Sequence, residues 1–223
     1  MKTLALTLLL LLSGIGSMLH AQEFTNYISC KVDGKEWKAE AKRMKIPVSG
    51  FEYLALAAFQ VSPDVQVWIR LYYLQGNLKP GTYPILIEDN LETESRKKAD
   101  RDLVWALVDY TSETKGLGYA FHDGESLSGT LTIDKVSKTS ISGSFESTLT
   151  GVTYKKRAFA AVTGGGIRAN LERKAMTKAG GGMLANGGPH DHDNTKRADK
   201  TDPIVLSEGK FFVDWSKTEK ESK

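Results

Sequence analysis

Apolar and polar residues alternate with a period of two over much of this chain, most clearly between residues 65 and 74. Val67, Ile69 and Leu71 occupy every second position there, and Trp68 and Arg70 lie between them. Because successive side chains of a β-strand point to opposite faces, this pattern predicts a strand with one face in a hydrophobic core. The complete core-facing set is Val65, Val67, Ile69, Leu71 and Tyr73, and the opposite set is Gln66, Trp68, Arg70 and Tyr72.

The same pattern recurs along the chain and predicts an all-β protein. Leu127, Leu131 and Ile133 alternate with polar residues, and Asp33-Gly34 separates two short runs in the manner of a tight hairpin. The other segments expected to form strands are 51–61, 83–87, 103–110, 140–149, 154–162 and 204–215. We expect a single antiparallel β-sandwich-like domain of about nine or ten strands, with a closed β-barrel as the alternative because alternation looks the same in both.

Residues 163–202 interrupt this pattern. They contain the triplets Gly164-Gly165-Gly166 and Gly180-Gly181-Gly182, and they include no Phe, Tyr or Trp. A loop of about 40 residues is uncommon within a compact domain unless it is functional or lacks a fixed structure. We therefore expect a Gly-rich flexible insertion at 163–202, followed by the last strand.

Residues 1–21 differ from the rest of the chain. Lys2 precedes an apolar run from Leu4 to Leu12, and small residues follow, which is typical of a cleavable export signal. Ile15 stands where a bacterial lipoprotein would carry its lipidated cysteine, so no lipid anchor is expected. The run is shorter than the roughly 20 residues of a membrane-spanning helix, and no later stretch is apolar enough to span. We expect a free periplasmic or secreted protein that begins at Gln22.

Composition narrows the possible partners of the mature chain. Cleavage leaves 202 of the 223 residues, enough for one domain, and lowers the formal net charge from +3 to +2. A balance so close to neutral argues against a nucleic-acid partner, which requires a concentrated basic patch.

Cys30 is the only cysteine, so it cannot form an intramolecular disulfide and is expected to be buried.

Trp68, Arg70 and Tyr72 are the candidate ligand-binding residues. Two aromatic rings and a cation along the polar face of one strand could stack on a sugar ring or another planar ligand. The alternative is that a second sheet or a loop covers this face and makes the row part of the core.

His190, Asp191, His192 and Asp193 are the candidate metal ligands. Two imidazoles and two carboxylates within four positions suit zinc, copper or nickel. The alternative is a solvated polar loop, because metal sites normally draw their ligands from rigid elements.

No catalytic residues and no cofactor are expected. The chain contains neither a Gly-x-Ser-x-Gly elbow, nor a His-Glu-x-x-His pair, nor a glycine loop followed by Lys-Ser/Thr. A groove that holds His122 beside two carboxylates would instead favour an enzyme.

Several segments, taken in order, carry a resemblance to known proteins. They are Val32 to Ala39, Lys79 to Tyr83, Gly129 to Ile133, Ile141 to Phe145 and Glu208 to Val213. Together they resemble a family of uncharacterised exported β proteins, frequently lipoproteins, of Bacteroidota-type bacteria. The resemblance implies a single β-sandwich-like domain at the cell envelope and supplies no established activity.

These observations favour an exported, non-enzymatic envelope protein that acts as a binding or interaction module. Its ligand would be an envelope component or a glycan. The alternatives are a secreted hydrolase that acts on envelope or dietary polymers and a structural component of a surface assembly.

Overall fold

The computed structural model describes residues 24–44, 52–61, 64–73, 78–90, 104–114, 120–156 and 195–217. The expected export signal and the His190 to Asp193 cluster lie outside these ranges, as does the expected insertion up to residue 194. Within them no helix is long and apolar enough to cross a membrane.

Nine strands and one short 3-10 helix make up the described part of the chain, which confirms the all-β class. The strands are β1 (Tyr27–Val32), β2 (Lys35–Met44), β3 (Glu52–Val61), β4 (Asp64–Tyr73), β5 (Gly81–Ile85), β6 (Val104–Thr114), β7 (Ala120–Val136), β8 (Ser140–Lys156) and β9 (Thr195–Asp214), and the helix η1 is Glu88–Asn90. Two expected strands, 140–149 and 154–162, are one continuous strand up to Lys156. The last strand begins at Thr195, inside the segment that we expected to be an insertion.

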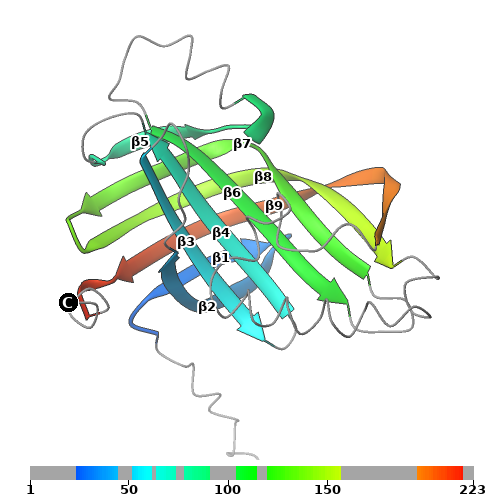
Figure 1. The fold of residues 1–223 in the computed structure, drawn as a ribbon, viewed down its shortest axis with the longest axis horizontal. Coiled ribbons are helices and arrows are strands. Elements are labelled where there is room, and N and C mark those ends of the chain that lie inside the picture. Colours follow the sequence, from blue (N-terminus) through cyan, green and yellow to red (C-terminus); the bar gives the residue numbers. More distant parts are fainter. Residues whose placement is uncertain are drawn as a thin grey trace, which may run out of the picture.

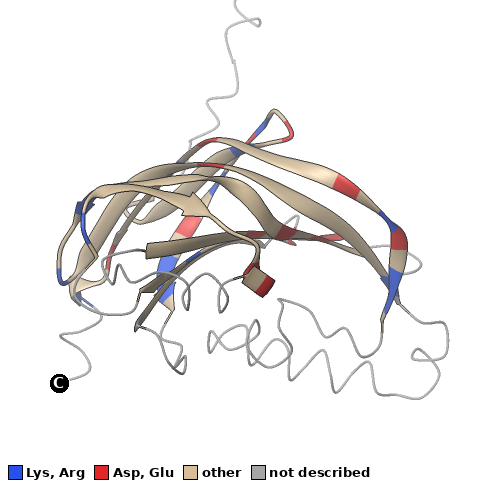
Figure 2. Ribbon diagram, turned by 90° about the horizontal axis from the view of Figure 1, so that it is seen from above, with Lys and Arg blue, Asp and Glu red and all other residues tan. Residues whose placement is uncertain are grey.

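The strands form one sheet that closes on itself in the order β1-β2-β3-β4-β6-β5-β7-β8-β9. The ring closes because β1 pairs with β2 on one side and with β9 on the other. This is the closed arrangement that alternation alone could not distinguish from a sandwich. Strands β3, β4 and β6 lie side by side, and β7, β8 and β9 cross them in the view of Figure 1. Seen from above, the strands follow a curved surface (Figure 2).

The hairpin between β1 and β2 forms as its sequence predicts. Asp33 and Gly34 have φ angles of 49° and 80°, so both central residues of the turn are left-handed. Val32 then pairs with Lys35, and Cys30 pairs with Trp37. This register turns the side chains of Ile28 and Cys30 into the core.

A single large hydrophobic cluster fills one face of the closed sheet and draws on every strand. The alternation in β4 is confirmed, since Val67, Ile69 and Leu71 are fully buried in this cluster. Burial of apolar surface on this scale is the main stabilising contribution to such a fold.

The long strands β7 and β8 bend at bulges, and one bulge changes an expected side-chain direction. We expected Leu127 on the core face together with Leu131, but Leu127 is 40% exposed. The register between β7 and β8 shifts between Ser126 and Ser128, so one residue is inserted at this point. An inserted residue re-aims the side chains around it, which places Leu127 outside.

β5 is inserted as a wedge between β6 and β7. It pairs with β6 in parallel through Ile85 and Ala106, and with β7 in antiparallel fashion, while β6 and β7 pair directly farther along. The Ser126 hydroxyl lies at the fork, where it accepts a hydrogen bond from the Val108 N–H at 3.2 Å and donates to the Leu86 carbonyl at 2.7 Å. One buried side chain thus satisfies two backbone groups that the separating strands leave unpaired.

Candidate functional site

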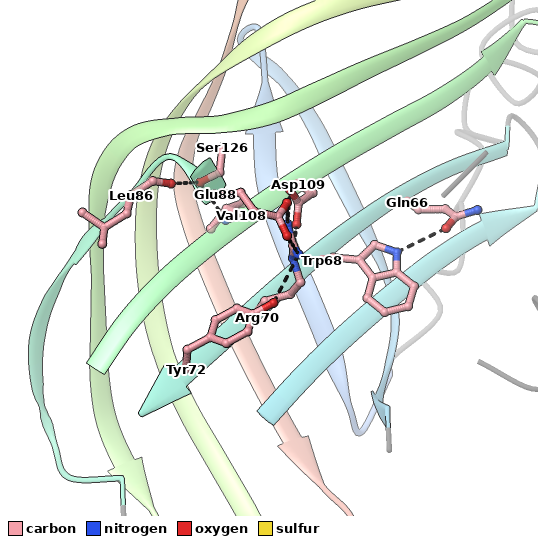
Figure 3. A network of polar contacts seen from close by, with 9 residues as sticks. All are labelled: Gln66, Trp68, Arg70, Tyr72, Leu86, Glu88, Val108, Asp109 and Ser126. Atoms are coloured by element: carbon pink, nitrogen blue, oxygen red, sulfur yellow. Dashed lines mark hydrogen bonds and ion pairs between the residues drawn. The ribbon is translucent and has the colours of Figure 1, made fainter. Parts of the chain in front are cut away.

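Arg70 on β4 is at the centre of a polar network on the face of the sheet opposite the main core (Figure 3). Its Nε and Nη2 atoms donate to the two carboxylate oxygens of Asp109 on β6, at 2.7 and 2.9 Å. Its Nη1 and Nη2 atoms donate to the two oxygens of Glu88 in η1, at 2.7 and 2.9 Å. Nη1 also lies 3.3 Å from the Tyr72 hydroxyl. The guanidinium is therefore held on two sides by bidentate pairs.

The network holds Arg70 in its charged form. Burial alone would lower the pKa of Arg70, but Asp109 and Glu88 outweigh it and hold that pKa well above the ordinary value. Burial also raises the pKa of Glu88, yet the Arg70 guanidinium prevails and leaves that pKa below the usual value. Burial raises the pKa of Asp109 as well, and Arg70 opposes this effect. The ion pairs tie η1 to the outer face of β4 and β6.

The aromatic members of the predicted row are covered. The exposed fraction is 3% for Trp68 and 6% for Tyr72. The Trp68 ring packs edge-on against Phe59 with ring centroids 5.7 Å apart, and its indole N–H donates to the Gln66 side-chain oxygen at 3.2 Å. The Tyr72 ring contacts Tyr53 with centroids 4.7 Å apart. The structure thus brings the three predicted residues onto one face, where both rings are packed against protein.

His122 and Cys30 occupy different surroundings. Nε2 of His122 on β7 lies 3.0 Å from a carboxylate oxygen of Asp202 on β9, and Gly151 of β8 lies between them. Among the described residues, one carboxylate pairs with His122, rather than the two that would favour an enzyme. Cys30 is buried in the core, and burial, together with Glu36, raises the pKa of its thiol to about 12. A thiol with such a pKa is a poor nucleophile. In the described ranges no three His, Cys, Asp or Glu residues are grouped as metal ligands would be.

A second candidate site lies on the outer face of β7, β8 and β9, where the surface has a groove of about 280 Å³. Thr130, Thr132, Ser144, Phe145, Glu146, Glu208, Gly209 and Lys210 line it. Gly209 lets β9 approach β8 closely beside this groove, because a Cβ atom there would lie 2.4 Å from the Phe145 carbonyl oxygen and 2.7 Å from the Phe145 ring.

A bulge in β9 shapes one wall of the groove. The register between β8 and β9 shifts between Phe145 and Ser147, and Glu208 has a φ of 53°, which is unusual for a residue other than glycine. The Glu208 N–H donates to a carboxylate oxygen of Glu146 at 2.9 Å, and its carboxylate forms an ion pair with Lys31 of β1. The bulge therefore aims Glu208 outward and fixes it there.

Three side chains of the groove keep their hydrogen-bonding capacity. Within the described ranges, no hydrogen bond or ion pair engages the side chains of Thr130, Ser144 or Lys210.

The sequence did not predict this site, because its residues come from three strands and appear in the sequence only as ordinary polar positions of an alternating pattern. The sequence signal that could have pointed to it is Glu208-Gly209, which interrupts the alternation of the last strand.

Comparisons of the chain with protein-family models, with curated proteins and with solved structures found no match. The chemistry of the described residues is thus the basis for a functional proposal.

Proposed function

We propose that the protein is an exported, non-enzymatic module that binds a ligand at the cell envelope, and that the ligand lies in the groove of β7, β8 and β9. The observation that carries the proposal is the groove lined by Thr130, Ser144 and Lys210, whose side chains no other described residue engages. Such groups exchange water for a ligand without breaking a bond inside the protein.

The backbone at Glu208 supports the same site. A residue other than glycine in the left-handed region costs of order 1–3 kcal/mol, and such conformations cluster at functional sites. At this position the conformation places a carboxylate on the wall of a groove.

The leader supports export. The segment Lys2 to Leu12 and the lack of a lipidation cysteine at Ile15 favour release of a lipid-free chain that begins at Gln22. The intact mass of the protein recovered from the periplasm or medium tests this part. The mass of residues 22–223 is expected, and a mass that retains the leader or carries acyl chains would refute it.

Lysine footprinting tests the site. The mature chain is acetylated with a water-soluble ester, with and without a soluble polysaccharide extract of the envelope, and modification of each lysine is followed by mass spectrometry. Lys210 should be protected by the extract. Lys200, an exposed lysine of the same strand outside the groove, is the matched control and should react equally in both samples. Equal labelling of Lys210 in both samples would remove the groove from the proposal.

A further inference from the structure

The groove belongs to a longer row of polar side chains that crosses the sheet from strand to strand. Cross-strand pairing places one such residue after another in register: Thr82 of β5 pairs with Thr132 of β7, Thr132 with Ser144 of β8, Ser144 with Lys210 of β9, and Lys210 with Ser29 of β1. We call these five residues the polar row. Neighbouring strands lie about 4.7–4.9 Å apart, so the row offers a hydrogen-bonding group at each such step.

Most of the row is available for hydrogen bonds to a ligand. Thr82 and Thr132 share a bond between their hydroxyl oxygens at 2.9 Å. In the described part of the chain, no such contact occupies the side chains of Ser144, Lys210 or Ser29. A hydroxyl both donates and accepts, and the Lys210 ammonium donates three bonds. A ligand that follows the row therefore meets both donors and acceptors.

Side chains of both charges lie beside the row, which narrows the class of ligand. Glu146 and Lys210 carry opposite charges in the groove, and Lys31 is paired with Glu208. An anionic ligand next to Lys210 would also approach two carboxylates, and a cationic ligand would approach two ammonium groups. Like charges at close range oppose binding. A neutral ligand rich in hydroxyls has no such conflict.

From this geometry we infer that the ligand is a neutral, linear oligosaccharide that lies across the strands along the polar row. The inference rests on the proposed function, because it names the ligand class of the same groove. A chain of sugar units that crosses β7, β8, β9 and β1 meets a new polar side chain on each strand. A longer oligosaccharide thus forms more hydrogen bonds than a single sugar does.

Titration calorimetry on the mature chain tests the inference. The probes are neutral linear glucose, mannose and xylose oligosaccharides of one to six units, and galacturonate oligosaccharides as the anionic counterpart. At least one neutral series should bind with an affinity that increases with length. Ser144→Ala, at the centre of the row, should weaken binding of every length by about 2- to 10-fold, the loss expected for one hydrogen bond.

A variant at the end of the row separates row binding from simple groove binding. Ser29→Ala should weaken only the longer oligosaccharides, and Ser128→Ala, an exposed serine of β7 outside the groove, should change nothing. Equal thermal unfolding of the three variants and the parent excludes misfolding.

Three results would overturn the inference, and they differ in what they mean for the site. Preferential binding of galacturonate that depends on Ser144 and Lys210 would reject the neutral class but keep the groove. Binding of a neutral series that neither Ser144→Ala nor Lys210→Met weakens would reject the groove itself. Failure of every neutral series to bind would reject the ligand class, and the footprint of Lys210 would then decide whether the groove remains.

Discussion

Two buried tryptophans show how much a single polar atom changes the role of a side chain. The indole N–H of Trp68 donates to the buried Gln66 side chain, while the Trp37 Nε1 atom is the one buried side-chain nitrogen or oxygen of the described residues without a hydrogen-bond partner. Both residues are nearly inaccessible, with exposed fractions of 3% and 8%.

Replacing each tryptophan by phenylalanine removes the same atoms in two different contexts. Trp68→Phe leaves the buried Gln66 oxygen unpaired, whereas Trp37→Phe removes a donor that has no acceptor. We expect Trp68→Phe to lower the free energy of unfolding by about 1–3 kcal/mol more than Trp37→Phe does. Urea denaturation of the two variants measures the difference, and equal losses would show that the Trp68–Gln66 bond contributes nothing.

At the scale of elements, the Arg70 network fastens η1 to the sheet. Glu88 is 53% exposed on its side chain, so its pair with Arg70 is only partly shielded from solvent. Because the pKa of Glu88 in the folded protein lies below the ordinary 4.5, the charged form stabilises the fold. This contribution is complete above pH 4.5 and is lost as the pH falls through the lower folded-state pKa.

The pH dependence of a Glu88 variant follows from the lowered pKa of Glu88 in the folded protein. Glu88→Gln should lower the free energy of unfolding at pH 6 by about 0.5–1 kcal/mol, since solvent screens a half-exposed pair. The loss should be smaller at pH 3, which lies below the ordinary pKa of 4.5, because protonation of Glu88 increasingly favours the unfolded chain there. Asp89→Asn alters the neighbouring exposed carboxylate and is the matched control. A loss that is the same at both pH values, or equal to that of Asp89→Asn, would contradict the ion-pair account.

Element by element, alternation predicted strands and their inward faces well, as Val67 and Ile69 of β4 show. It failed at Leu127, because a bulge adds a residue without leaving a recognisable sequence pattern. It also could not show that β5 separates β6 from β7, since the choice of partner strand depends on contacts distant in sequence.

The candidate sites, like the strands, could be predicted from the sequence only in part. Alternation predicted that Trp68, Arg70 and Tyr72 share one face. It could not predict that other residues bury the two rings, or that Glu88 pairs with Arg70. The groove depends on pairing register across three strands, which the sequence of any single strand does not contain.

At the scale of the whole molecule, the two terminal strands are neighbours. The Asn26 side chain, just before β1, donates to the Asp214 carbonyl at 2.9 Å and accepts from the Asp214 N–H at 2.9 Å, at the end of β9. A domain whose first and last strands meet in this way tolerates new termini elsewhere when the two strands are joined.

A circular permutant tests this arrangement. Joining residue 217 to residue 24 through a short glycine-serine linker and opening the chain between the exposed residues Ser137 and Lys138 should retain the fold. The circular dichroism spectrum should match that of the parent, with a cooperative thermal transition. A permutant opened within β8 is the control that should fail. Failure of the turn-opened permutant as well would contradict the expectation that the two ends can be joined and the β7–β8 turn opened.

Closure of the ring by β9 also has a consequence for the order of events during synthesis. β1 emerges first, yet one of its two partners is among the last segments to be made, so its outer edge stays unpaired until the chain is nearly complete. Pairing between such distant segments is slow, because a long loop must close before any contact compensates for it. Under the export that we propose, the ring closes only after β9 has followed β1 across the membrane.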